Sequence, residues 1–192
     1  MKNIFDGVKK IHLIGIGGIG MSGIAEYLVR KDYEVTGSDM TKSLITGRLE
    51  NLGIKIFEGH KGENLPDDTD LVIYSAAIKE DNSEYQKAVL FNKRKVKRAE
   101  ALGNIVNSKF VISVSGTHGK TTTTAMIAKI FIENGFDPTV FVGGIIDLLD
   151  GGSSRIGNSE IAIVEADEYD RSFLTLQSDI IVITNIVYII SK

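Results

Sequence analysis

Residues 115–122 read SGTHGKTT and combine two glycines, a lysine and several hydroxyls. The apolar run 110–114 precedes them, and residues 123–134 follow with a high content of apolar side chains. This pattern predicts a buried strand, a turn and a largely buried helix. Glycines let a backbone approach a polyphosphate closely, and a helix N-terminus offers free N–H groups and a positive dipole end. The spacing therefore predicts a phosphate-binding loop.

The side chains of this loop have the types that nucleotide chemistry needs. Lys120 supplies a positive charge for the outer phosphates, and the Thr121 hydroxyl can ligate Mg²⁺. Val114 stands where the full Walker pattern has its first glycine, so the loop is the shortened form G-x-x-G-K-T. The alternative is a glycine-rich turn with a surface lysine. The predicted loop comprises Gly116, Thr117, His118, Gly119, Lys120, Thr121 and Thr122.

A carboxylate follows a second apolar run further along the chain. Residues 161–164 are apolar and lead into Glu165, with Asp167 and Glu168 just behind. A buried strand that ends in an acid is the usual partner of a phosphate loop, because its carboxylate faces the metal. The alternative is an acidic loop after a core strand. The upstream loop favours a metal site made by Thr121 and Glu165, with the other two acids as second choices.

A second glycine-rich turn lies near the start of the chain. Residues 10–14 predict a strand, residues 15–20 carry the pattern G-x-G-x-x-G, residues 21–31 predict a helix, and residues 33–37 predict a second strand. Asp39 lies 19 residues after the last glycine of the turn. An acid at the end of the second strand of a β-α-β unit is typical of a dinucleotide or nucleotide-sugar site, where it holds a ribose. The alternatives are chance turn glycines and a helix N-cap role for the acid.

The same alternation continues through the first half of the chain. Helices are predicted at 43–52, 84–91 and 99–106, and strands at 54–57 and 71–74. Ligands of open parallel sheets bind beyond the carboxyl ends of the strands, so Ser75 and Ala76 are expected beside a diphosphate. The alternative is a strand-to-helix turn in which Ser83 caps the next helix. The basic run 93–98 predicts a solvated face, from which Arg98 is placed to reach a phosphate or carboxylate.

The second half of the chain predicts fewer elements. Strands are expected at 138–142 and 179–185, and residues 147–158, which are polar and glycine-rich, predict a flexible loop. We expect two α/β units in tandem. Residues 1–106 form a Rossmann-like, mostly parallel sheet with helices on both faces, and residues 107–192 form an incomplete P-loop α/β domain. The incomplete sheet is expected to expose an edge and apolar surface, and hence to be marginally stable or to associate.

Composition narrows the class of protein. The 192 residues are 43% hydrophobic and 24% charged, which is ordinary for a globular protein. The net charge of −3 gives no sign of a nucleic-acid or anionic-membrane partner. No cysteine is present, so disulfides and cysteine metal sites are excluded. The chain starts without the pattern of a signal peptide and has no apolar run of the roughly 18 residues that a membrane helix needs. A cytoplasmic protein is expected.

Taken together, these stretches resemble the Mur ligase family. The resemblance rests on several short motifs that occur in family order over nearly the whole chain. They are residues 12–22 (HLIGIGGIGMS), 37–39 (GSD), 74–78 (YSAAI), 98–100 (RAE), 116–122 (GTHGKTT), 143–144 (GG) and 165–168 (EADE). The set is far more specific than any one of its members.

The resemblance implies that the first domain holds a UDP-sugar instead of NAD, and that the second binds ATP and Mg²⁺. ATP would bind the predicted phosphate loop, Thr121 and Glu165 would hold the metal, and Lys120 and Glu165 would be the catalytic residues. The UDP-sugar site would comprise Gly15, Gly17, Gly18, Ile19, Gly20, Met21, Ser22, Ser38, Asp39, Ser75, Ala76 and Arg98.

The resemblance also implies a reaction. The lactyl carboxylate of UDP-N-acetylmuramate would be activated as an acyl phosphate, and the amine of L-alanine would then attack it. A close relative within the family attaches a recycled murein peptide to the same UDP-sugar, and residues 165–170 are compatible with both acceptors. The residues that choose the acceptor are expected in a C-terminal domain beyond this chain. The family's Asn-Ile-Glu-x-Asp-His motif, with its metal-binding histidine, is not matched after Asn185 and Ile186. The 192-residue chain is therefore expected to bind the UDP-sugar, to bind nucleotide weakly and not to turn over.

Three other interpretations compete with a ligase. The first is a nucleotide-sugar-binding module without enzymatic activity. The second is an NAD-dependent oxidoreductase, which would rest on the first glycine turn and Asp39 and would leave the Lys120 loop unexplained. The third is a P-loop GTPase, but no Asn-Lys-x-Asp motif for reading the base is present.

Overall fold

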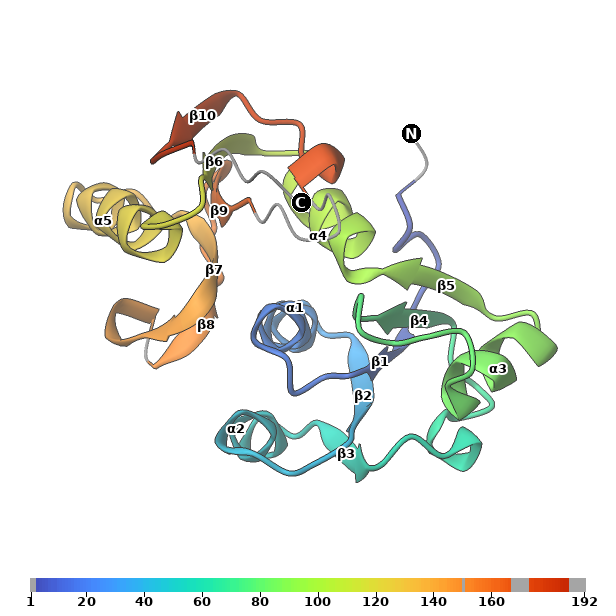
Figure 1. Ribbon diagram of the computed structural model, residues 1–192. Helices are drawn as coiled ribbons and strands as arrows, with labels where there is room; N and C mark the ends of the chain where they lie inside the picture. The colour runs from blue at the N-terminus through green and yellow to red at the C-terminus, as the bar shows by residue number, and fades with distance from the viewer. Residues whose placement is uncertain (1–2, 150, 167–172, 187–192) are drawn as a thin grey trace, which may run out of the picture. The chain divides into compact units, whose positions relative to one another are not determined.

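The computed structural model describes residues 3–149, 151–166 and 173–186. It contains two compact units, Met1–Asn104 and Ile105–Lys192, each of which is described by itself (Figure 1). We predicted a division after residue 106, at the end of helix α4 (Arg98–Val106), whereas the units divide within the last turn of that helix. None of the helices in the described ranges combines the length and apolar character that a membrane span requires.

The first unit is built on a five-stranded sheet in which every pair of neighbours is parallel. Its order is β3-β2-β1-β4-β5. The strands are β1 (Lys10–Ile14), β2 (Glu34–Asp39), β3 (Lys55–Glu58), β4 (Leu71–Tyr74) and β5 (Arg94–Lys97). β1 lies at the centre, and its side chains from Ile11 to Ile14 are buried on both faces, as a parallel strand covered by helices requires. The predicted Rossmann-like sheet is confirmed.

Helices cover both faces of this sheet. They are α1 (Ile19–Arg30), α2 (Leu44–Asn51), α3 (Ser83–Leu90) and the short η1 (Gly62–Asn64). Figure 1 shows α1 and α2 on one face and α3 on the other. Ser43 caps α2 through a capping box, so Asp39 is not the N-cap of that helix. The N-cap of α3 is Asn82, which accepts two backbone N–H groups, and the predicted cap Ser83 is instead the first helical residue.

The basic run near residue 95 is strand β5, which we had predicted only as a solvated face. Val96 points into the core while its neighbours Lys95 and Lys97 are more exposed, which is the period of two expected for a strand. The lysine before the strand is also engaged, since Lys93 Nζ donates to the backbone carbonyl of Thr69 at 3.0 Å. Charged side chains at a sheet edge discourage pairing with other chains, which accounts for the composition of this strand.

The second unit contains a mixed sheet with the order β10-β6-β9-β7-β8. Its strands are β6 (Phe110–Ser115), β7 (Thr139–Ile146), β8 (Gly152–Arg155), β9 (Ile161–Glu165) and β10 (Ile180–Ile183). All pairs are parallel except β7 with β8. The prediction of a flexible loop over 147–158 is wrong, because this stretch contains η2 (Asp147–Leu149) and the antiparallel strand β8.

Asp137 fixes the end of β8 and the residues that follow this strand. The carboxylate of Asp137 accepts the backbone N–H of Asn158 at 2.8 Å and is paired with Arg155 at 2.6 Å. These contacts, the Asn158 N–H first, lower the pKa of Asp137 below its ordinary value. Polar contacts therefore hold this segment in place without burying apolar side chains. The spacing of apolar residues in the sequence does not predict such contacts.

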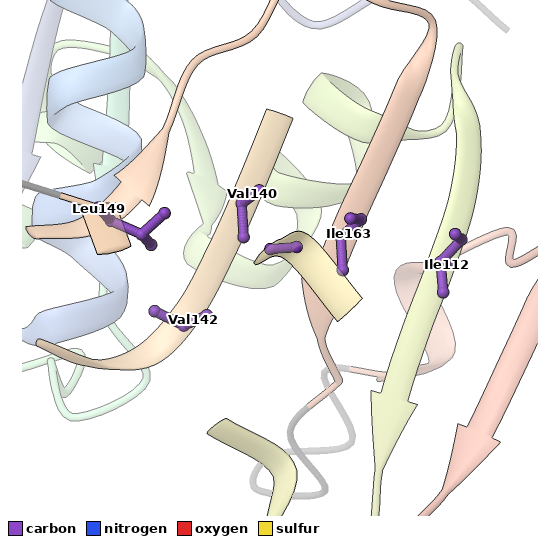
Figure 2. Close-up of a cluster of buried hydrophobic side chains, with 6 residues drawn as sticks. Ile112, Val140, Val142, Leu149 and Ile163 are labelled. Carbon is purple, nitrogen blue, oxygen red and sulfur yellow. The ribbon is translucent and has the colours of Figure 1, made fainter. Parts of the chain in front are cut away.

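The core of the second unit lies between the sheet and helix α5 (Lys120–Glu133). Figure 2 shows Ile112, Val140 and Ile163 from three neighbouring strands, with Leu149 beside them. The helix starts three residues earlier than the predicted 123, and the prediction that it is largely buried is wrong. Only Thr124 and Ala128 of α5 are buried, because a single face of the helix packs on the strands.

The edge strand β10 leads to a first prediction. Ile180, Ile181 and Ile183 on this strand are 45%, 63% and 58% exposed. An apolar strand at the edge of a sheet is a template for pairing with another chain. We expect the chain to associate at micromolar concentration and expect Ile181→Lys to shift it toward the monomer, as measured by light scattering. Leu44→Lys is the control, since Leu44 is 94% exposed on the other unit. A wild-type chain that stays monomeric throughout this range would contradict the prediction.

Candidate functional site

A cavity of about 750 Å³ lies at the carboxyl ends of the strands of the first unit. The chain leaves β1 toward β2 on one side and later returns to β4 on the other, so the strand order reverses beside β1. Open parallel sheets bind ligands at such a switch point. Residues from several strand ends line the cavity, including Gly15, Gly17, Gly18, Asp39, His60 and Ser75.

Backbone contacts hold the glycine turn that forms one wall of this cavity. Gly15 has a φ of +79°, which favours glycine, and its N–H donates to the carbonyl of Ser38 at 2.8 Å. Asp39 Oδ2 accepts the N–H of Gly17 at 2.8 Å. A Cβ on Gly17 would lie 2.8 Å from the same oxygen, so a larger residue here would push the carboxylate away from the turn. Helix α1 follows with Gly18 as its N-cap and no capping side chain, which leaves its N-terminus able to receive an anion.

Arg98 lies at the same helix N-terminus. A Cβ built on Gly20 would be 2.7 Å from Arg98 Nη1, which shows how closely the guanidinium approaches the first turn of α1. The charge of the arginine and the positive end of the helix therefore favour an anion at one place. The structure therefore places Arg98 beside the glycine turn, and its contact with a phosphate stays a prediction.

The other predicted UDP-sugar residues occupy different positions. Met21 and Ser22 are buried in α1, and the hydroxyl of Ser22 donates to the carbonyl of Ile19 at 2.8 Å. Ala76 is exposed after β4. Ser38 is fully buried, and its hydroxyl donates to Glu84 Oε1 at 2.7 Å. Their side chains support the turn or lie beside it, and they are absent from the cavity lining among the described residues.

Several lining residues were not anticipated from the sequence. They include His60, Lys79, Asp81 and Asn82. His60 follows the carboxyl end of β3 by two residues. The rule that placed Ser75 at the end of β4 would also have placed His60, had it been applied to the third strand.

The second unit contains the phosphate loop. Gly116 and Gly119 have φ values of +132° and +81°, and α5 begins directly after them at Lys120. Thr117 and His118 are exposed in the loop, and Thr122 is exposed in the first turn of the helix. Lys120 Nζ donates to the carbonyl of Gly116 at 2.7 Å. The lysine therefore lies over the loop, where it can meet a phosphate.

Thr121 and Glu165 meet beside this loop, although they come from α5 and β9. The Thr121 hydroxyl donates to Glu165 Oε2 at 2.8 Å, and the same oxygen accepts the N–H of Gly143 at 2.7 Å. A Cβ on Gly143 would lie 3.0 Å from Glu165 Oε1, and one on Gly144 would lie 3.1 Å from Thr121 Cγ2. The two glycines thus leave room for the pair.

This pair fits a magnesium ion. Mg²⁺ prefers oxygen ligands and usually combines one or two protein oxygens with waters and substrate phosphates. The described residues contain no group of three or more acidic or histidine side chains that could hold a metal alone. A hydroxyl and a carboxylate next to a phosphate loop match the donor set that Mg²⁺ uses with a nucleotide. Asp167 and Glu168, the second choices for this role, lie outside the described residues.

The segment after β10 anchors the loop, which the sequence did not reveal. Asn185 Oδ1 accepts the backbone N–H groups of Thr117 and His118 at 2.8 and 3.2 Å. The hydroxyl of Thr184 donates to the carbonyl of His118 at 2.6 Å. These contacts join residues separated by at least 66 positions, so no local pattern reports them.

The chain belongs to the Mur ligase family. The model for "Mur ligase family, catalytic domain" matches residues 10–110, and the predicted resemblance is confirmed. Among individual proteins, the chain is 50% identical over 180 residues to the UDP-N-acetylmuramate–L-alanine ligase of Clostridium tetani. It is 51% identical over 177 residues to the ligase of the same name from Lachnoclostridium phytofermentans.

Solved structures of ligases with related names also match this chain. The UDP-N-acetylmuramate–alanine ligase MurC of Thermotoga maritima matches 92% of this chain with a TM-score of 0.86 and 38% identity. A murein peptide ligase of Psychrobacter arcticus matches 94% of the chain with the same TM-score of 0.86 and 28% identity. The chain spans only part of their length, namely 39% and 38% of the two curated relatives and 41% and 43% of the two solved chains.

Proposed function

We propose that this chain is the UDP-sugar-binding unit and the first part of the ATP-binding unit of a ligase that joins L-alanine to UDP-N-acetylmuramate. The observation that carries the proposal is the contact of Thr121 and Glu165 at 2.8 Å beside the phosphate loop. This contact brings together two oxygens that suit the Mg²⁺ ion of an ATP-dependent enzyme. The chain is also 50% and 51% identical in sequence to two relatives named for this reaction.

We assign different roles in that reaction to Lys120, Thr121 and Glu165. A carboxylate oxygen of the UDP-sugar attacks the γ-phosphorus of ATP, ADP leaves, and an acyl phosphate results. The amine of L-alanine then attacks the acyl carbon, and phosphate leaves as the amide forms. Lys120 and the N-terminus of α5 offset the charge on the transferring phosphoryl group. Mg²⁺ held by Thr121 and Glu165 would supply further positive charge at the phosphates.

The first unit would hold the UDP-sugar for this reaction. The N-terminus of α1 and Arg98 favour the diphosphate at the glycine turn. Asp39 is placed at the same turn, where its Oδ2 already holds the Gly17 N–H. Holding reacting groups in a good orientation lowers a barrier by up to roughly 7–11 kcal/mol.

A murein peptide is the alternative acceptor. The structures of the two kinds of ligase match this chain with equal TM-scores of 0.86, so the fold does not separate them. Among these solved structures, the identity of 38% to the alanine ligase against 28% to the murein peptide ligase favours L-alanine.

Titration calorimetry tests the proposal. We expect UDP-N-acetylmuramate to bind the chain with a one-to-one stoichiometry, in the absence as well as in the presence of Mg²⁺ and ATP. NAD is the contrasting ligand, because the glycine turn alone would also suit a dinucleotide. Binding of NAD without binding of the UDP-sugar would overturn the proposal.

A further inference from the structure

A carboxylate is buried beneath the cavity of the first unit and is surrounded by two histidines. Glu84 and His12 are fully buried, and the side chain of His60 is 13% exposed. Glu84 Oε2 lies 2.7 Å from His12 Nε2, and Glu84 Oε1 lies 2.9 Å from His60 Nδ1. The hydroxyl of Ser38 donates to Glu84 Oε1 at 2.7 Å. Four segments that are distant in sequence therefore meet at one buried carboxylate.

The fully buried side-chain polar atoms of this cluster all have hydrogen-bond partners. His12 Nδ1 lies 2.8 Å from the hydroxyl of Thr36, which donates to it when His12 Nε2 carries the proton toward Glu84. A buried carboxylate is strongly destabilising unless it accepts hydrogen bonds, and Glu84 receives them from both histidines and Ser38. The N-terminus of α3, where Glu84 lies in the first turn, adds a favourable dipole.

This arrangement decides which nitrogen of His60 carries the proton. An ionised carboxylate only accepts hydrogen bonds, so Nδ1 of His60 must be the protonated nitrogen. In the neutral form of the ring, Nε2 then keeps its lone pair. His60 also lines the cavity, and its hydrogen bonds within the described residues are those of Nδ1 with Glu84 and Ser38. Nε2 is consequently the polar atom that the ring can offer to a ligand.

A serine nucleophile activated by histidine and glutamate does not fit the same geometry. Ser38 and Glu84 both contact Nδ1 of His60, at 3.1 and 2.9 Å, whereas a catalytic triad uses the two different ring nitrogens. Ser38 is also fully buried. The cluster therefore holds a side chain in place and does not activate a nucleophile.

We propose that Glu84 is a positioning residue that fixes the tautomer of His60, so that Nε2 of His60 accepts a hydrogen bond from the nucleoside of the bound ligand. Diphosphate oxygens only accept hydrogen bonds and cannot pair with an unprotonated Nε2. The ribose hydroxyls and the imide N–H of uracil are donors and can. The diphosphate would then lie at the glycine turn and Arg98, and the nucleoside at His60. This inference rests on the proposed binding of a UDP-sugar to the first unit.

Glu84→Gln tests it with almost no change of shape. The amide can present its N–H₂ to His60 Nδ1, which moves the ring proton to Nε2 and removes the acceptor. Thr36→Val is the matched control, because it alters the far end of the same cluster and leaves the contact between Glu84 and His60. We expect long-range ¹H–¹⁵N spectra to show His60 protonated on Nδ1 in the wild type and in Thr36→Val, and on Nε2 in Glu84→Gln.

Ligand titrations followed by NMR complete the test. We expect Glu84→Gln to weaken the binding of UDP by about tenfold, which corresponds to about 1.4 kcal/mol, and to leave inorganic pyrophosphate unchanged. The Thr36→Val variant should bind both probes as the wild type does. A loss of UDP binding in Glu84→Gln with an unchanged His60 tautomer, or equal losses for UDP and pyrophosphate, would overturn the inference. Failure of UDP to bind the wild type would instead contradict the proposed function, whatever the tautomer.

Discussion

Replacing Lys120 with methionine is expected to weaken the binding of Mg²⁺–ATP to this chain by about 100-fold. The ammonium group lies over the phosphate loop, where it donates to the carbonyl of Gly116 at 2.7 Å. Hydrogen bonds to charged groups contribute about 1.5–3 kcal/mol, and every 1.4 kcal/mol is a factor of ten in affinity. Methionine is an unbranched side chain only slightly shorter than lysine, and it carries no charge. Calorimetry or a fluorescent ATP analogue measures the change.

The control for this variant lies on the same helix. Lys129→Met removes a lysine whose side chain is 60% exposed and paired with Glu133 at 2.9 Å, one turn further on. Exposed pairs of this kind contribute about 0.3–0.5 kcal/mol, so this variant should keep its affinity for ATP and almost all of its stability. Equal affinities of Lys120→Met and Lys129→Met would show that the loop does not hold phosphate.

The parts of the site that were predictable depend on local sequence. The glycine turn and the loop at Lys120 are each formed by a few consecutive residues. Their glycines indicate the backbone conformations that these turns require. Glu165 could also be assigned, because the strand before it is apolar and the loop upstream calls for an acid. Their positions in the structure agree with these expectations, while their roles in binding remain predictions.

The buried cluster could not be predicted, because its members are polar and distant in sequence. Glu84 lies in the first turn of a short helix, where an acid is ordinarily a solvated residue that favours the helix dipole. It is fully buried only because His12 and Ser38, 72 and 46 positions away, supply hydrogen bonds. The pattern of apolar residues predicts which faces of the helices and strands are buried. It does not predict hydrogen bonds between buried polar residues that are distant in sequence.

The two strands that we did not predict, β5 and β8, contain few apolar residues. β8 reads GSSR and has no apolar residue, yet Ser153 and Ser154 are buried against β7. β5 reads RKVK and contains one apolar residue. Both lie at sheet edges, where the backbone pairing of a neighbouring strand defines the element and the side chains contribute little.

Gly37→Ala is expected to have the largest effect on stability in the first unit. Gly37 is buried in β2, and an added Cβ would lie 2.9 Å from the carbonyl oxygen of Leu13 and 2.9 Å from Cβ of Ile16. Both atoms are near the main chain and cannot rotate away. Overpacking of this kind destabilises by about 1–3 kcal/mol, and we expect the upper end, with a fall in melting temperature of more than about 10 °C. Urea and thermal unfolding measure the change.

Gly47→Ala provides a control with the opposite sign. Gly47 lies in the middle of α2, and a Cβ there would meet no atom within 4 Å. Alanine in a helix interior is more favourable than glycine by about 0.8–1 kcal/mol, so this variant should be more stable than the wild type. The Gly37 variant should also bind UDP more weakly, because Ile16 belongs to the turn whose N–H groups bond to Ser38, at 3.0 Å for Ile16 itself. If Gly37→Ala were as stable as the wild type, the close packing of β2 under the glycine turn, and with it our account of how the fold holds that turn, would be wrong.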